Sequence, residues 1–215
     1  MLVSSAWPLG AMLLLAGTVV GCGGEPAPRV ERERSAAVDD AAAAGVEAEV
    51  GVVDLDGRPF DPLARADARA VVLLFVSTHC PIANRYAPTM RGLAAGWREQ
   101  GVATYLVYPD PDDGPAAIVE HQRQYELPMP ALRDPEHQLV ARAEVRVTPE
   151  AAVFMPGTAK PAYHGRIDDR AVEFGKVRAE ATTHELADAV AAVVAGRTPV
   201  AADAPAIGCY ISDLR

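Results

Sequence analysis

The sequence is poor in the residues on which several protein classes depend. It has 3 cysteines in 215 residues, too few for a disulfide scaffold or a cysteine-rich zinc module. A dinucleotide-binding fingerprint, a P-loop and an HExxH motif are all missing from it. Its 20 basic residues face 29 acidic ones, for a net charge of −9 without a basic stripe, which makes nucleic acid a poor partner. Hydrophobic residues still make up 50% of the chain, enough for the core of one ordinary globular domain.

The start of the chain is typical of an export signal. Residues 11–20 form an apolar run that is too short to cross a bilayer and suits the hydrophobic region of a signal peptide. The run ends in Val-Val-Gly-Cys22, which resembles a bacterial lipobox, where the cysteine is lipidated and the chain is cut before it. No Lys or Arg precedes the run, which departs from that pattern, and the alternative is a buried core helix. We expect a lipoprotein signal peptide over residues 1–22, with lipidation at Cys22.

Three parts follow this signal. Residues 23–45 are rich in Gly, Pro, Ala and mixed charges and have almost no large apolar residue, which predicts a flexible tether. Residues 46–196 carry the pattern of a folded domain, and residues 197–215 form a proline-containing tail with Cys209. We expect a membrane-anchored lipoprotein of the bacterial cell envelope, facing the periplasm or the exterior. In such an oxidising compartment, Cys80 and Cys209 are the two cysteines left for redox chemistry.

Strands and helices alternate within the expected domain. Continuous apolar runs over 70–76 and 102–107 are typical of strands covered on both faces. Further strands are expected at 47–55, 127–134, 151–155 and 162–166. Helical patterns begin after Cys80, at 115–125, after Asp134-Pro135, and after the capping-box spacing of Thr182 and Glu185. This order predicts an α/β fold with a central mixed sheet.

Cys80 stands where a buried strand gives way to a helix. A cysteine just before a helix faces unpaired backbone N–H groups and the positive end of the helix dipole. Both favour the thiolate and lower the pKa of the thiol. Pro81 suits the first helical position because it has no N–H to lose. We therefore expect a reactive cysteine, with an inert buried cysteine as the alternative.

The stretch VVLLFVSTHCPIANRYAP, residues 71–88, resembles the nucleophile segment of the thioredoxin-like superfamily. Cys80 stands at the first cysteine of the superfamily's Cys-x-x-Cys, and Pro88 at its helix-kinking proline. Val147-Thr148-Pro149 resembles the superfamily's cis-proline loop, which packs against the active cysteine. The resemblance implies a thioredoxin-like three-layer α/β/α fold with a cis Thr148-Pro149 bond facing Cys80, in which Thr148 and Pro149 shape the substrate groove.

At two positions the sequence departs from the motifs of the superfamily. Ala83 replaces the second cysteine of Cys-x-x-Cys, and Leu73 replaces the proline of the peroxiredoxin motif, of which Ser77 is retained. The chain is most similar to redoxin (AhpC/TSA-like) proteins of bacterial envelopes, through CPIANRY at 80–86, GRIDDR at 165–170 and Gly-Cys-Tyr-Ile at 208–211. For the GRIDDR run itself we expect only a surface charge cluster, in which Arg166 and Arg170 pair with Asp168 and Asp169.

The resemblance and the cysteine positions together imply a thiol-dependent oxidoreductase. Cys80 is the expected nucleophile, and Cys209, on a mobile tail, the expected resolving cysteine. We expect an intramolecular Cys80–Cys209 disulfide, which is either catalytic or a structural link that pins the tail. The substrate is expected to be a protein disulfide, with an electron donor that the sequence does not identify. The alternatives are a peroxiredoxin-like peroxide reductase, in which Ser77 polarises the attack, and a binding module that has lost turnover.

No metal or other cofactor is expected, and copper is the one metal for which the sequence offers candidate ligands. The candidate ligands for copper are His79, His164, Asp168, Asp169, Cys80 and Cys209. Copper-binding members of the superfamily use Cys-x-x-x-Cys, and position 84 is asparagine here, so the second ligand is missing. The remaining histidines, His121, His137 and His184, are expected to be solvated on helix faces.

Overall fold

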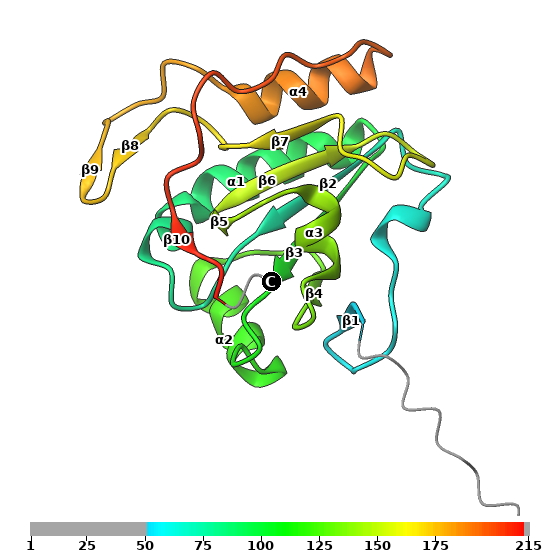
Figure 1. Ribbon diagram of the computed structural model, residues 1–215, viewed down its shortest axis with the longest axis vertical. Helices are drawn as coiled ribbons and strands as arrows, with labels where there is room; N and C mark the ends of the chain where they lie inside the picture. Colours follow the sequence, from blue (N-terminus) through cyan, green and yellow to red (C-terminus); the bar gives the residue numbers. More distant parts are fainter. Residues whose placement is uncertain (1–50, 213–215) are drawn as a thin grey trace, which may run out of the picture. The chain divides into compact units, whose positions relative to one another are not determined.

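The computed structural model describes residues 51–212 (Figure 1). Its centre is a six-stranded sheet in the order β1-β4-β3-β2-β6-β7. Strands β2, β3 and β4 run parallel, whereas β1, β6 and β7 each pair antiparallel with their neighbours. The strands are β1 (Val53–Asp54), β2 (Ala70–Phe75), β3 (Val102–Tyr108), β4 (Ala131–Arg133), β6 (Glu150–Phe154) and β7 (Tyr163–Gly165). The expected mixed sheet is therefore confirmed.

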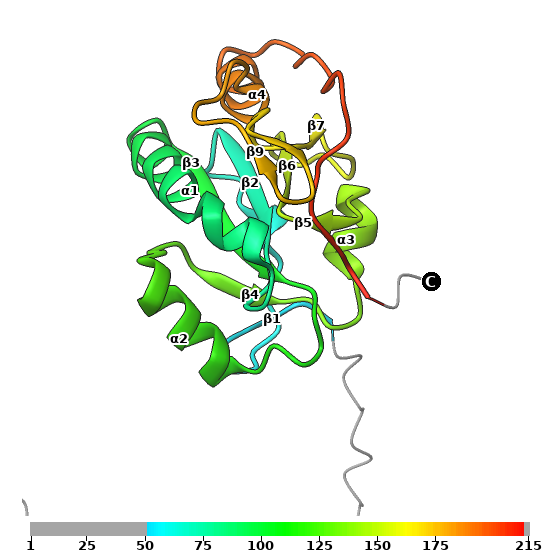
Figure 2. The same cartoon turned by 90° about the vertical axis from the view of Figure 1, so that its left-hand side faces the viewer.

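Helices cover both faces of this sheet. They are α1 (Pro81–Glu99), α2 (Pro115–Tyr125), α3 (Gln138–Ala143) and α4 (Glu185–Val194), with a short 3₁₀ turn at Pro62–Ala64. Strand β2 is buried along its whole length: Val72 and Leu74 pack with α1, α2 and α4, and Val71, Leu73 and Phe75 pack with α3. Figure 2 shows α1 and α3 on opposite sides of the sheet. The three-layer α/β/α arrangement predicted from the sequence is confirmed.

Helix α1 forms for the reasons that the sequence suggests. Cys80 is its N-cap, with extended backbone, and Pro81 occupies the first helical position. The residues spaced by about one turn form a buried stripe that faces the sheet, comprising Ile82, Tyr86, Met90 and Trp97, with Leu93 partly buried. Burial of this stripe fixes the helix against β2 and β3, and with it the position of Cys80 at the helix N-terminus.

Two helix starts differ from the prediction. Helix α3 begins at Gln138 rather than directly after Asp134-Pro135, because His137 adopts a left-handed conformation. The Asp134 carboxylate nevertheless accepts the backbone N–H groups of Gln138 and Val140, as a capping residue does. Helix α4 begins at Glu185, and no capping box forms because the Thr182 hydroxyl binds Asp169 instead. The hairpin of β8 (Ala171–Glu173) and β9 (Lys176–Val177) was not predicted.

The C-terminal part of the described chain forms no helix, as expected, and packs against the rest of the domain. We call residues 197–212 the strap. Strand β10 (Cys209–Tyr210) pairs antiparallel with β5 (Val147–Thr148), and Ile211 is buried in the core on the α3 side of the sheet. Within residues 51–212, no helix is both long and apolar enough to cross a membrane. Residues 1–50, with the expected signal, Cys22 and tether, lie outside the described residues, so the domain boundaries stay predictions.

Candidate functional site

Cys80 lies buried at the N-terminus of α1, at the carboxyl end of the central strand β2. Its side chain is only 2% exposed. The Sγ atom accepts a hydrogen bond from the backbone N–H of Ala83 at 3.4 Å, one of the N–H groups that a helix start leaves without a partner. In its protonated form the thiol donates to the backbone carbonyl of Thr148 at 2.9 Å. The sulfur is thus enclosed by the helix start and the loop before β6.

Cys209 is held against Cys80 by pairing of the strap with β5. In this pairing Cys209 faces Thr148, and Tyr210 faces Val147. The two Sγ atoms lie 2.9 Å apart, longer than the bond of about 2.05 Å in a disulfide, so both residues are free thiols in this structure. The structure therefore brings together the two cysteines that the sequence paired, and their disulfide stays a prediction.

The pKa values of the two thiols shift in opposite directions. Burial works against the thiolate of Cys80, but hydrogen bonds from the Cys209 thiol and the Ala83 N–H outweigh it and lower the pKa of Cys80 below its ordinary value. Burial raises the pKa of Cys209 to about 12, with a further contribution from its hydrogen bond with Cys80. The first proton therefore leaves the pair from Cys80, which becomes the nucleophile.

The loop before β6 completes this site. The Thr148-Pro149 peptide bond is cis, which confirms the expectation, and the carbonyl of Thr148 lies against the Cys80 sulfur. The strap approaches this loop so closely that a Cβ on Gly208 would lie 2.3 Å from the Thr148 carbonyl oxygen. Only glycine lets β10 reach the edge of β5 at this point, so Gly208 is a site residue that the spacing of the motif did not reveal.

A small cavity leads to the two sulfur atoms. Its volume is about 160 Å³, room for a small molecule or a single side chain. It is lined by Ser77, His79, Cys80, Pro109, Asp110, Thr148, Cys209, Tyr210, Ile211 and Ser212. Ser77 thus lines the cavity, and within residues 51–212 its side-chain oxygen accepts one hydrogen bond, from the backbone N–H of His79. This lining contains no Lys or Arg side chain to stabilise negative charge on an attacked oxygen.

Behind the site, a buried polar network holds the loop that carries Cys80. Asp113 is fully buried and accepts hydrogen bonds from both the backbone N–H and the hydroxyl of Thr78. The Asn84 amide donates to the Thr78 carbonyl at 3.4 Å, and its Oδ1 lies 2.7 Å from His121 Nε2. His121 Nδ1 lies 2.9 Å from the hydroxyl of Tyr108. Every polar backbone group of Thr78 is therefore bound, which fixes the loop.

His121 corrects one expectation. The sequence predicts a solvated histidine on a helix face, but the ring is 5% exposed and lies between Tyr108 and Asn84. Burial lowers the pKa of His121, so it is neutral at pH 7, with Nε2 donating to Asn84 and Nδ1 accepting from Tyr108. An apolar stripe on α2 that includes position 121 could have signalled this burial.

Replacing Thr78 with valine is expected to destabilise the domain by about 1–3 kcal/mol, because the buried Asp113 carboxylate loses a donor. Denaturant unfolding measures the change. Thr104→Val is the matched control, since the Thr104 hydroxyl is buried without a hydrogen-bond partner among residues 51–212. That control is expected to leave the stability equal or higher. Equal losses for the two variants would contradict the role of Thr78.

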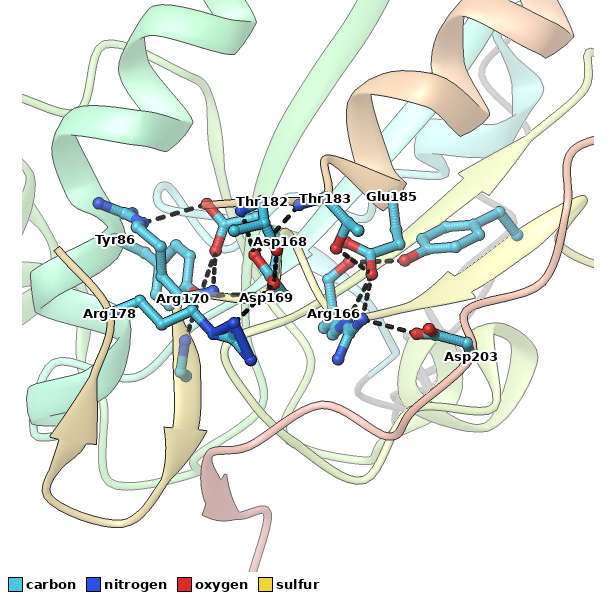
Figure 3. A network of polar contacts seen from close by, with 12 residues as sticks. Tyr86, Arg166, Asp168, Asp169, Arg170, Arg178, Thr182, Thr183, Glu185 and Asp203 are labelled. Carbon is cyan, nitrogen blue, oxygen red and sulfur yellow. Dashed lines mark hydrogen bonds and ion pairs between the residues drawn. The ribbon is translucent and has the colours of Figure 1, made fainter. Parts of the chain in front are cut away.

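The GRIDDR run is not the surface cluster that the sequence suggests. Asp168 and Asp169 are only 4% and 6% exposed, because each is enclosed by several donors (Figure 3). Asp168 accepts from the Tyr86 hydroxyl at 2.5 Å and from the backbone N–H and guanidinium of Arg170. Asp169 accepts from Thr182 and from the backbone N–H of Thr183, and pairs with Arg178. The expected Arg170–Asp168 pair is present; Arg166 instead pairs with Glu185 and Asp203.

The side chains considered for copper are not gathered in one place. His79 lines the cavity beside Cys80. His164 lies on β7 instead, near Glu144 and Glu150, and Asp168 and Asp169 are occupied by the donors above. Within residues 51–212, no group of three or more His, Cys, Asp or Glu side chains is arranged to hold a metal ion. The copper hypothesis therefore finds no ligand set in this part of the chain.

Comparison with known proteins agrees with this geometry. Residues 40–163 match the sequence model of the AhpC/TSA family. A hypothetical protein from Sinorhizobium meliloti 1021 has a similar structure, with a TM-score of 0.63 at 24% identity over 74% of this chain and 88% of that one. An uncharacterised conserved protein from Geobacillus kaustophilus has a TM-score of 0.59 at 21% identity over 75% of this chain and 86% of that one. No curated protein sequence matches the chain.

Proposed function

Because the chain belongs to the AhpC/TSA family, we propose that it is a redoxin-type thiol–disulfide oxidoreductase in which Cys80 and Cys209 form the redox pair. The observation that carries this proposal is the distance of 2.9 Å between the two sulfur atoms. Ala83 removes the usual second cysteine from α1, and the strap supplies a thiol from the far end of the chain in its place. Thr148 of the cis-proline loop lies against Cys80, pairs with Cys209 and lines the cavity, whereas Pro149 does not line it.

The proposed reaction proceeds in two exchanges. The Cys80 thiolate attacks one sulfur of a substrate disulfide, forms a mixed disulfide and releases the other substrate sulfur as a thiolate. Cys209 then loses its proton and attacks the Cys80 sulfur of the mixed disulfide, which releases the second substrate thiol. The substrate disulfide has been reduced to two thiols, and the chain now carries the Cys80–Cys209 disulfide. A dithiol electron donor returns the pair to the reduced state.

The position of each sulfur determines where that donor attacks. Cys80 is 2% exposed, whereas Cys209 is half-buried and lies beside Tyr210, which is 81% exposed. Attack on Cys209 expels the Cys80 thiolate, which is the better leaving group because its pKa is the lower of the two. Access and leaving-group chemistry therefore both direct the donor to Cys209.

Peroxide reduction is the second candidate, favoured by the position of Ser77 in the lining of the cavity. In that reaction the Cys80 thiolate takes one oxygen of a hydroperoxide and releases an alcohol, and Cys209 displaces water from the sulfenic acid. The cavity lining has no Lys or Arg side chain for the leaving oxygen and instead carries Asp110. The geometry therefore supports disulfide exchange better.

Assays of the unaltered chain with two oxidants test the proposed function. We expect catalysis of the reduction of insulin disulfides by dithiothreitol, and consumption of hydrogen peroxide at a much lower rate under the same conditions. Hydrogen peroxide reduction without insulin reduction would replace the proposal with the second candidate. If the chain catalyses neither reaction, the alternative of a binding module is favoured.

The reactivity of the pair is expected to depend on pH in two widely separated steps. Since the pKa of Cys80 is lowered and that of Cys209 is raised to about 12, alkylation by iodoacetamide should modify Cys80 at a lower pH than Cys209. In Cys209→Ala the hydrogen bond to Cys80 is lost, and the alkylation profile of Cys80 should move to higher pH. An unchanged profile in Cys209→Ala would contradict the role of Cys209 in activating Cys80.

We also propose that the chain is anchored in the bacterial envelope by lipid on Cys22, which would bring the site to an oxidising compartment. Support comes from the apolar run before Val-Val-Gly-Cys22 and the polar tether after it. Mass analysis of the N-terminal peptide from membranes tests this: a diacylglyceryl group on Cys22 supports it, and an unmodified Cys22 in a soluble chain overturns it.

A further inference from the structure

The GRIDDR run contacts the strap directly, at two neighbouring positions. A Cβ on Gly165 would lie 3.2 Å from the side chain of Ala202, so the absence of a side chain there makes room for the strap. The next residue, Arg166, binds the Asp203 carboxylate at 2.6 Å. Figure 3 shows Arg166 between Glu185 of α4 and Asp203 of the strap. Two independent contacts thus hold adjacent strap residues at the end of β7.

The Arg166 guanidinium is fixed before it meets the strap. Its Nε binds Glu185 at 2.7 Å, and the side chains of Arg166 and Glu185 are only 15% and 13% exposed. Glu185 is held in turn by the Thr183 hydroxyl at 2.7 Å. Because a planar guanidinium bound on one side presents its remaining N–H groups in a fixed direction, Asp203 meets a preorganised donor.

Between this contact and the site, the strap has few degrees of freedom. Ile207 packs against the core on the α1 side of the sheet, Gly208 lies against the Thr148 carbonyl, and Cys209 follows in β10. Release of the strap at Asp203 would remove one of the restraints on the segment that leads to Cys209. The effective concentration of the Cys209 thiol at Cys80 depends on how that segment is held.

We propose that Arg166 is a positioning residue, which seats the strap through Asp203 and so keeps the Cys209 thiol against Cys80. The consequence of this placement for catalysis rests on the proposed function. The placement of Cys209 itself can be measured without catalysis. The contact with Asp203 gives the GRIDDR run, for which the sequence suggested only a charge cluster, a role in assembling the thiol pair.

The test uses the full-length chain with Cys22→Ser, which leaves Cys80 and Cys209 as its only thiols. Dibromobimane, which links two neighbouring thiols, reports whether they are adjacent in the reduced protein. Asp203→Lys should lower the rate of cross-linking about fivefold, the upper range for an exposed ion pair, because the contact with Arg166 becomes repulsive. Asp203→Glu should restore the rate to within about twofold, since it keeps the charge.

Glu180→Lys is the matched control, since it makes the same charge change at an exposed position outside the strap and should leave the cross-linking rate unchanged. An unchanged rate in Asp203→Lys, or an equal loss in Glu180→Lys, would overturn the inference. Insulin reduction by the same variants separates the two proposals. If the chain does not reduce insulin but Asp203→Lys still loses cross-linking, the positioning role of Arg166 stands and only the proposed function is overturned.

Discussion

Cys80→Ser is expected to reduce the rate of insulin reduction to that of dithiothreitol alone. Serine has no thiol to ionise, and Cys209 is a poor replacement because burial raises its pKa above the ordinary value. The substitution is nearly isosteric at a side chain that is 2% exposed, so the fold should persist, which circular dichroism checks. Turnover of insulin by a folded Cys80→Ser variant would contradict the assignment of the nucleophile.

Cys209→Ser is the matched comparison, because it should stop the reaction one step later. Cys80 still attacks a disulfide, but no thiol of the chain resolves the product. With oxidised glutathione and the Cys22→Ser chain, we expect one glutathionyl group on Cys80 of Cys209→Ser, detected by intact mass, and none on Cys80→Ser. A stable adduct on neither variant would show that external disulfides do not reach Cys80.

Gly208→Ala is expected to slow formation of the Cys80–Cys209 disulfide by at least about tenfold. The new Cβ would lie 2.3 Å from the Thr148 carbonyl oxygen and 2.7 Å from its carbon, and both belong to backbone that cannot turn away. The strap must therefore shift, and a displacement of about 1 Å between reacting groups can cost about 10²-fold in rate. Quenching reduced protein with a fast alkylating agent after addition of oxidised glutathione measures the rate.

Gly96→Ala makes the same substitution in α1, where, apart from neighbouring helix backbone, no atom of residues 51–212 lies within 4 Å of the new Cβ. It should leave the rate of disulfide formation unchanged and, by removing a glycine from a helix interior, stabilise the domain by about 0.5–1 kcal/mol. Equal rates of disulfide formation in Gly208→Ala and Gly96→Ala would show that the close approach of the strap to β5 does not position Cys209 at Cys80.

The parts of the fold that depend on local pattern were predictable from the sequence. The run at 70–76 is apolar at every position, which occurs in a strand covered on both faces, and β2 is such a strand. Pro81 after Cys80 predicted the start of α1, and apolar residues spaced by about one helical turn predicted its buried face. The proline loop at Thr148-Pro149 was predicted only through resemblance, because no local rule requires that bond to be cis.

The rest of the site depends on contacts between distant segments, which sequence patterns do not encode. Asp113 and His121 are polar residues that look solvated until Thr78, Asn84 and Tyr108 enclose them. The buried carboxylates of Asp168 and Asp169 likewise depend on donors from α1 and from the segment before α4. The sequence predicts a mobile tail beyond the last helix, whereas the structure pairs the strap closely with β5, which Gly208 allows.

The central claim is that Cys80 and Cys209 form one reversible redox pair. Its most direct test is a non-reducing peptide map of the full-length chain with Cys22→Ser, equilibrated in glutathione buffers of increasing reducing strength and quenched in acid. The account predicts a single disulfide, between the peptides that contain Cys80 and Cys209, whose fraction falls smoothly to zero as reduced glutathione increases. Two unlinked cysteines in every buffer, or a link that persists when glutathione is fully reduced, would contradict it.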